Sequence, residues 1–172
     1  MRNRQIQRMV LAAMLAALCC VATLVIQVPS PMSGYVNLGD GVVLLSGWIL
    51  GPAYGFAAAG LGSAMADVFS GYTHYAAGTF LIKGFMAVIA YYLAAKCLKK
   101  RPSLGRALGA AAAECWMVAG YFGYACLILG KGLAAAASIP GNLVQGIFGL
   151  AVALVAAELL IRSKRLKGVM HA

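Results

Sequence analysis

Long apolar runs separated by short polar segments dominate the chain. A transmembrane helix needs about 20 mostly apolar residues to cross roughly 30 Å of hydrocarbon. We predict a helix for each of six apolar runs, at residues 9–28, 42–50, 54–72, 75–97, 107–129 and 142–161. The second run is short unless neighbouring residues extend it. The pattern predicts an all-α integral membrane protein, in which residues 1–172 form a single six-helix membrane domain.

The segment between the first two predicted helices differs in composition from the rest. Residues 29–41 are rich in Gly, Pro, Ser, Asn and Asp, which are the residue types that favour turns. This segment could close over a cavity as a lid, or it could simply connect two helices.

The first apolar run begins after basic residues, as a secretory signal does. Its length exceeds the usual apolar region of such signals, about 7–15 residues, and no clear cleavage site follows it. We therefore expect the run to be retained as a helix.

Composition supports the membrane interpretation. The chain is 63% apolar and 10% charged, whereas soluble domains are about a quarter charged and under half apolar. A disordered basic chain is excluded because such chains lack apolar mass. Nucleic-acid-binding domains place their basic residues among polar surface residues, but here the charges lie between apolar runs. We expect a lipid bilayer as partner and no nucleic acid.

The net charge of +10 is concentrated in three segments. Twelve of the 14 basic residues lie before the first predicted helix, between the fourth and fifth, or after the sixth: Arg2, Arg4, Arg8, Lys96, Lys99, Lys100, Arg101, Arg106, Arg162, Lys164, Arg165 and Lys167. An even number of helices places these three segments on one side, and the positive-inside rule makes that side cytoplasmic. We predict an N-in, C-in topology with basic cytoplasmic tails at about 1–8 and 162–172.

Ionisable residues inside predicted helices are candidate functional residues, because charge is costly in lipid. Asp67, Lys83 and Glu114 are in this class. Asp67 and Lys83 differ in predicted depth by roughly 5 Å, a distance that a lysine stem can span. One interpretation is therefore a structural Asp67–Lys83 ion pair. The other is that one or both side chains face a polar ligand.

Three predicted helices also carry polar or aromatic stripes at helical spacing. The stripes are Thr79 and Lys83; Glu114, Met117, Tyr121 and Tyr124; and Asn142, Gln145 and Gly149. Tyrosines near helix ends often mark only the membrane interface. The amides of Asn142 and Gln145 are stronger evidence for a cavity, because an amide in lipid needs hydrogen-bond partners.

Catalytic and metal-binding signatures are missing from the sequence. We find no H-E-x-x-H, G-x-S-x-G or phosphate-loop motif, and the five cysteines lack metal-ligand spacing. We expect no enzymatic activity, no metal and no cofactor. Uphill transport would therefore need an energy source supplied by partner proteins.

Four segments together resemble a known family. They are Gly34-Tyr-Val-Asn-Leu-Gly-Asp40, Gly51-Pro-Ala-Tyr-Gly55, Gly60-Leu-Gly-Ser-Ala-Met-Ala-Asp67 and Ile139-Pro-Gly-Asn-Leu-Val-Gln145. The chain resembles the substrate-binding S components of energy-coupling factor (ECF) vitamin transporters over roughly residues 8–165. The resemblance implies a multi-pass protein of a prokaryotic plasma membrane that binds a vitamin or precursor near the outer face. It also implies a membrane T component and two cytoplasmic ATPase subunits as partners.

The resemblance also implies where ligand and partner bind. The family's pocket, built from the loop after helix 1 and helices 4 to 6, corresponds to Asn37, Asp40, Thr79, Lys83, Glu114, Tyr121, Asn142 and Gln145. Small-x-x-x-small pairs on helix 1 would dock the T component, and the pairs here are Ala12 with Ala16 and Ala13 with Ala17. Their spacing allows close helix packing, which could also be ordinary packing within the chain.

The Tyr-Val-Asn-Leu-Gly-Asp version of the first segment is most similar to family members assigned to pyridoxine-like, hydroxymethylpyrimidine-like or riboflavin-like compounds. The resemblance therefore implies a small heteroaromatic ligand, and tyrosine or tryptophan rings with hydrogen bonds from Asn, Gln and Lys suit such a ring. The alternative function is a stand-alone facilitator or proton-coupled carrier that uses Asp67, Lys83 and Glu114 as a relay.

Overall fold

The computed structural model describes residues 2–30, 34–98 and 100–162. Its α-helices are α1 (Arg2–Val25), α2 (Asp40–Leu50), α3 (Pro52–Phe69), α4 (Thr73–Tyr92), α5 (Pro102–Gly123) and α6 (Ile139–Arg162). A hairpin of β1 (Gln27–Ser30) and β2 (Gly34–Asn37) joins α1 to α2. Short π-helices η1 (Leu93–Cys97) and η2 (Tyr124–Ile128) extend α4 and α5, and a 3₁₀ helix, η3 (Gly132–Ser138), leads into α6.

Four helical segments are long and apolar enough to cross a membrane: Arg4–Val25, Thr73–Lys96, Pro102–Ile128 and Gly132–Arg162. Large apolar side chains, including Met14, Phe85, Ile147 and Phe148, are exposed on the outer faces of these segments. So much exposed apolar surface is unfavourable in water and suits contact with lipid. These four segments have the length and composition that the predicted membrane-spanning helices require.

The short second run forms a helix inside the bundle. α2 has 11 residues, all of them buried, and at 1.5 Å per residue it extends only about 16 Å. It packs against α1, α3, α4 and α6. A Cβ at Gly47 would overlap the carbonyl oxygen of Ala87, so glycine permits the close approach of α2 and α4. Gly51, at a φ of 78°, turns the chain into α3, which begins at Pro52.

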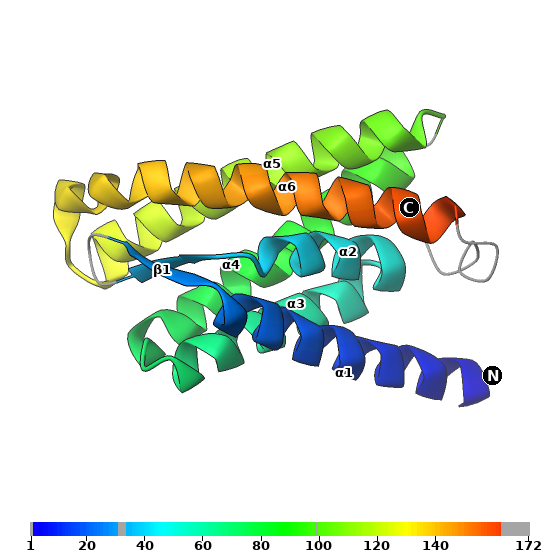
Figure 1. The fold of residues 1–172 in the computed structure, drawn as a ribbon, viewed down its shortest axis with the longest axis horizontal. Helices are drawn as coiled ribbons and strands as arrows, with labels where there is room; N and C mark the ends of the chain where they lie inside the picture. Colours follow the sequence, from blue (N-terminus) through cyan, green and yellow to red (C-terminus); the bar gives the residue numbers. More distant parts are fainter. Residues whose placement is uncertain (1, 31–33, 99, 163–172) are drawn as a thin grey trace.

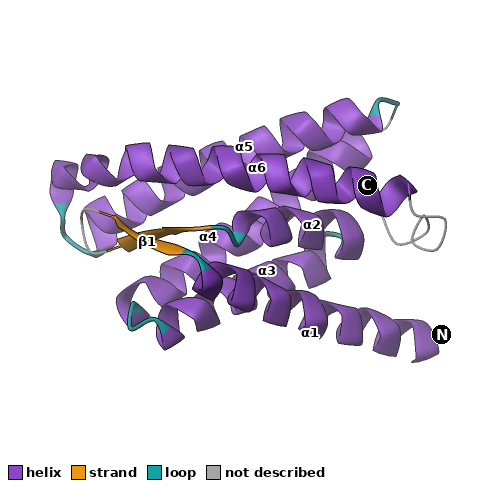
Figure 2. Cartoon of the chain, viewed as in Figure 1, coloured by secondary structure: helices purple, strands orange, loops and turns teal. Residues whose placement is uncertain are grey.

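The turn-rich segment after α1 is a hairpin, which the sequence did not predict. β1 and β2 are antiparallel, with Gln27 opposite Asn37, and α1 ends at Val25 rather than at residue 28. Four-residue strands are too short to show a clear alternation of apolar and polar positions. The Gln27 side chain donates to Ser70 Oγ at 2.7 Å, which ties the hairpin to the end of α3 (Figure 2).

The helices form a bundle with two distinct ends (Figure 1). One end, called the basic end here, holds the start of α1, the α2–α3 turn, η1 and the end of α6. Its exposed basic residues are Arg4, Arg8, Lys96, Lys100, Arg101 and Arg162. The other, the hairpin end, holds β1, β2 and the turns after α3 and η2. Lys99 and most of the predicted C-terminal basic tail, residues 163–172, lie outside the described residues.

Candidate functional site

A polar cavity lies at the hairpin end of the bundle. Its lining comes from β2, α3, α4, α5, η3 and α6: Gly34, Tyr35, Asn37, Asp67, Tyr75, Thr79, Tyr121, Ser138, Asn142 and Gln145. The cavity has a volume of about 40 Å³, which is room for a few water molecules at about 10–15 Å³ each. A buried hollow lined mainly by hydrogen-bonding groups is suited to a polar ligand.

Asn37 joins the hairpin to the far wall of the cavity. Its backbone N–H donates to Gln145 Oε1 at 2.9 Å, and its Oδ1 accepts from the backbone N–H of Gly39 at 2.9 Å. The second bond is an Asx turn, which leads the chain from β2 into α2. A Cβ at Gly39 would collide with Thr23 Oγ1. The start of α2, the hairpin and α6 are therefore fixed relative to one another at this point.

A chain of buried polar groups continues from Gln145 into the bundle. Gln145 Nε2 donates to Asp40 Oδ2 at 2.7 Å, and the ammonium group of Lys83 pairs with Asp40 Oδ1. The interpretation of an Asp67–Lys83 pair is therefore wrong. Asp40 begins α2 in the bundle interior and is fully buried, so the lysine stem reaches this carboxylate instead.

Asp67 is bonded to the hairpin. The Tyr35 hydroxyl donates to Asp67 Oδ1 at 2.6 Å. Burial and the neighbouring Asp67 carboxylate raise the pKa of the Tyr35 phenol, so the hydroxyl stays protonated and can donate at neutral pH. The other carboxylate oxygen, Oδ2, is buried and has no hydrogen-bond partner among the described residues.

Tyrosine rings form one side of the cavity. The ring centroids of Tyr75 and Tyr121 are 6.3 Å apart, and the Thr79 and Tyr121 hydroxyls are hydrogen-bonded at 3.1 Å. The Lys83 ammonium lies 5.4 Å from the Tyr121 centroid, and Lys131 Nζ donates to Tyr75 Oη at 3.1 Å. These rings provide aromatic faces and hydroxyls, which together suit a planar, hydroxylated ring.

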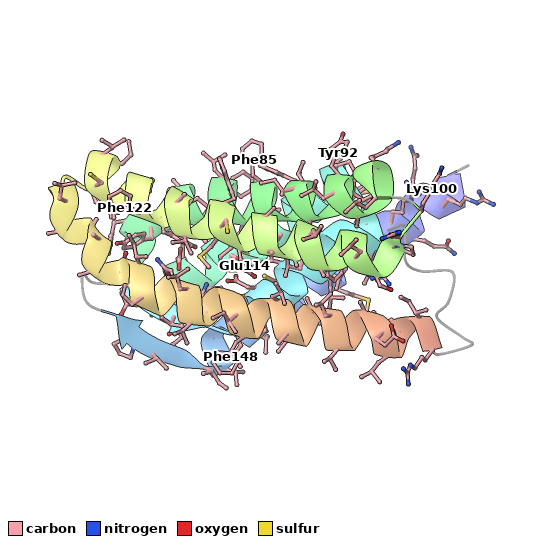
Figure 3. All side chains as sticks on the ribbon, turned by 90° about the horizontal axis from the view of Figure 1, so that it is seen from above. Phe85, Tyr92, Lys100, Glu114, Phe122 and Phe148 are labelled. Carbon is pink, nitrogen blue, oxygen red and sulfur yellow. The ribbon has the colours of Figure 1, made fainter. Side chains whose placement is uncertain are left out.

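Glu114 lies near the middle of α5 (Figure 3) and does not line the cavity. Gly149 of α6 leaves room for it, since a Cβ there would lie 2.8 Å from Glu114 Oε1 and would overlap Asp40 Cβ. Glu114 therefore packs beside Asp40, beneath the cavity. Neither of its carboxyl oxygens has a hydrogen-bond partner among the described residues.

Comparison with known proteins identifies the family. The family model described as "ECF-type riboflavin transporter, S component" matches residues 3–162. The chain belongs to this family. It is a family of transporter S components rather than a class of enzymes, and the resemblance seen in the sequence is confirmed.

Two further similarities concern a sequence relative and a solved structure. A Pyrococcus woesei protein described as "Uncharacterized protein in gap 3'region" is 36% identical over 134 residues, which cover 77% of this chain and 86% of the relative. A solved structure titled "Structure and mechanism of the S component of a bacterial ECF transporter" superimposes with a TM-score of 0.71 at 23% identity. It covers 90% of this chain and 96% of the solved chain, and it shows the shared fold.

The structure brings most of the predicted site residues of the S component together. Five of them line the cavity: Asn37, Thr79, Tyr121, Asn142 and Gln145. The other three, Asp40, Lys83 and Glu114, are buried beneath it. Sequence reasoning did not place Gly34, Tyr35, Tyr75 and Ser138 in the lining. For Asp67 it left two interpretations open, an ion pair with Lys83 or contact with a polar ligand, and the structure places Asp67 in the lining. The hydrogen bond from Tyr35 to Asp67 depends on tertiary structure, and no pattern in the sequence singled out Ser138.

The alanine pairs on α1 of the S component face two directions. Ala12 is buried in the bundle core, and the backbone of Ala16 contacts α3 so closely that a Cβ at Gly62 would overlap its carbonyl oxygen. Ala13 and Ala17 are exposed on the outer face. The first pair therefore packs within the chain, and the second remains accessible to a partner.

Proposed function

We propose that this S component captures a small water-soluble vitamin or precursor in the cavity at the hairpin end, for ATP-driven import with partner subunits. The observation that carries the proposal is a buried polar cavity, lined by tyrosine rings and amides, inside an S-component bundle. Its outer surface is apolar. Polar residues are costly inside a membrane-embedded bundle, so a cavity lined by them is a candidate functional site.

The lining favours a heteroaromatic ligand of the pyridoxine, hydroxymethylpyrimidine or riboflavin kind. Tyr75 and Tyr121 provide ring faces, and Asn142, Gln145 and Ser138 provide hydrogen bonds. Ligand pockets usually have volumes of about 300–1,000 Å³, so the cavity would widen from the present 40 Å³ to admit a whole vitamin. The hairpin would act as the lid, because its contacts with Asp67 and Gln145 hold it against the cavity wall.

The charge distribution supports an N-in, C-in topology with six membrane helices, two of them α2 and α3. Exposed basic residues gather at the basic end, which the positive-inside rule assigns to the cytoplasm of a prokaryotic cell. The hairpin end, which carries the cavity, would then face outward. The T component would dock on the α1 face that carries Ala13 and Ala17, because small residues allow close contact between helices in lipid. Two ATPases would complete the complex.

A second candidate function is a stand-alone facilitator or proton-coupled carrier. The observation that favours it is the buried cluster of Asp40, Lys83 and Glu114, because intramembrane carboxyls also form proton relays. The relay first envisaged from Asp67 through Lys83 is weakened by the Lys83–Asp40 pair. We therefore favour the binding subunit.

Reconstitution separates the two functions. The purified chain, placed alone in proteoliposomes with an imposed proton gradient, is expected to bind the vitamin without accumulating it. Addition of the T component, the ATPases and internal ATP is expected to start uptake. Sustained accumulation by the chain alone, driven by the proton gradient, would contradict the proposal. Mass spectrometry of the small molecule that co-purifies with the chain would identify the ligand.

A further inference from the structure

Asp67 presents an unused acceptor to the cavity. The residue is only 4% exposed and lines the cavity wall. Tyr35 satisfies Oδ1, but Oδ2 has no hydrogen-bond partner among the described residues. Buried polar groups in folded proteins nearly always have partners, and an unpartnered one calls for an explanation.

Two donors of the protein lie near Asp67, but their short contacts are with other groups. Lys83 pairs with Asp40, and the Thr79 and Tyr121 hydroxyls are hydrogen-bonded to each other. Within the described part of the chain, the salt bridges are Lys83–Asp40 and Arg162–Glu158, so Asp67 forms no salt bridge there. The Asp67 carboxylate is therefore built into the wall with one oxygen that accepts no hydrogen bond from the described residues.

We propose that Asp67 Oδ2 accepts an N–H donor from the bound ligand, and that the ligand is a nitrogen heterocycle with an amino group or a ring N–H at its edge. This inference rests on the proposed function. A polarised or positively charged N–H is the best complement to a buried carboxylate, because charge-assisted hydrogen bonds are roughly twice as strong as neutral ones. The Tyr35 hydroxyl holds Oδ1 and keeps Oδ2 directed at the ligand.

A matched set of ligands tests the donor directly. The purified chain is titrated with riboflavin, pyridoxine and 4-amino-5-hydroxymethyl-2-methylpyrimidine. Each is compared with an analogue methylated at the ring N–H or fully methylated at the amino group. The wild-type chain is expected to prefer the N–H form of its ligand by at least tenfold. Equal affinity for the two forms would overturn the inference while leaving the proposed function intact.

Two variants separate hydrogen bonding from steric bulk. Asp67→Leu removes both acceptor oxygens and is expected to weaken binding of the N–H form by at least tenfold and to make the affinities for the N–H and methylated forms nearly equal. Glu158→Gln, at an exposed carboxyl of α6 outside the cavity lining, is the control and is expected to retain the preference. An unchanged preference in a folded Asp67→Leu would mean that the methyl group merely clashes, and would overturn the inference. Failure of the folded wild-type chain to bind any of these ligands would contradict the proposed function, and the inference with it.

Discussion

At the scale of single residues, the buried charges of this S component divide into a paired set and an unpaired set. Lys83 and Asp40 are 2% and 0% exposed and form an ion pair, with Gln145 bonded to the second carboxylate oxygen. Glu114 and Asp67 have carboxyl oxygens that form no hydrogen bond with the described residues. A buried pair is costly to break because the remaining charge has no compensation, so the two sets should respond differently to mutation.

Lys83→Met is expected to destabilise the protein by about 3–5 kcal/mol, because it leaves Asp40 charged and buried. The exposed pair between Arg162 and Glu158 provides the matched control, and Arg162→Met should cost about 0–1 kcal/mol. Thermal unfolding in detergent measures both. Equal melting temperatures for the two variants would show that the buried pair does not hold α2 against α4.

Glu114→Gln is expected to leave ligand affinity within about twofold of wild type and to keep or raise the melting temperature. The change keeps the side-chain volume but removes a carboxyl that lies beside Asp40 and has no hydrogen-bond partner among the described residues. A loss of uptake in this variant, with binding intact, would instead favour the proton-coupled carrier.

At the scale of elements, α2 and the hairpin position the cavity. α2 is buried along its whole length and carries Asp40 at its start, while β2 carries Tyr35 and Asn37 to the cavity wall. The close contact between α2 and α4 depends on Gly47, where a Cβ would overlap the carbonyl oxygen of Ala87. In a packed interior, moving two backbones this close apart costs substantial free energy of folding.

Gly47→Ala is therefore expected to lower the melting temperature and to impair ligand binding, since α2 must move away from α4. Gly123→Ala is the control, because a Cβ there meets nothing within 4 Å and alanine favours helix by roughly 0.5–1 kcal/mol. Thermal unfolding and ligand titration of both variants make the comparison. If Gly47→Ala left both the melting temperature and the ligand affinity unchanged, the close packing of α2 against α4 would be contradicted.

The sequence predicts the elements whose signal is local and misses those that depend on tertiary contacts. The apolar runs that form α1, α4, α5 and α6 are long enough for the sequence alone to predict membrane helices. The hairpin was missed because its strands have only four residues each. That is too few positions to reveal the alternation of apolar and polar residues that marks a strand. Helical spacing placed Thr79, Tyr121, Asn142 and Gln145 at the cavity. Spacing could not decide whether Lys83 meets Asp40 or Asp67, because that choice depends on how α2 is buried between its neighbours.

At the scale of the whole molecule, the two regions to which we assign functions in our proposal are separate. The hairpin end carries the cavity, and the outer face of α1 carries Ala13 and Ala17. In an import complex, a binding site and a docking face would act separately. Substitutions at one region should therefore leave the other unaffected.

Ala13→Leu is expected to abolish uptake by the assembled transporter while leaving ligand affinity unchanged, because bulk on the exposed face of α1 blocks close helix contact. Ala12→Leu is the matched contrast. It adds the same bulk to a core position that is 9% exposed, and is expected to lower the melting temperature. Normal uptake by Ala13→Leu would show that the T component docks elsewhere.

The most direct test of the central claim, that the cavity at the hairpin end is the vitamin site, is equilibrium binding to the purified chain. Asn142 lines the cavity, and Asn142→Ala should raise the Kd by about tenfold or more, since a buried hydrogen bond to ligand contributes roughly 1–3 kcal/mol. Isothermal titration of the wild type and the variant, both with intact thermal transitions, gives the comparison. A Kd that does not change in Asn142→Ala would contradict the placement of the site.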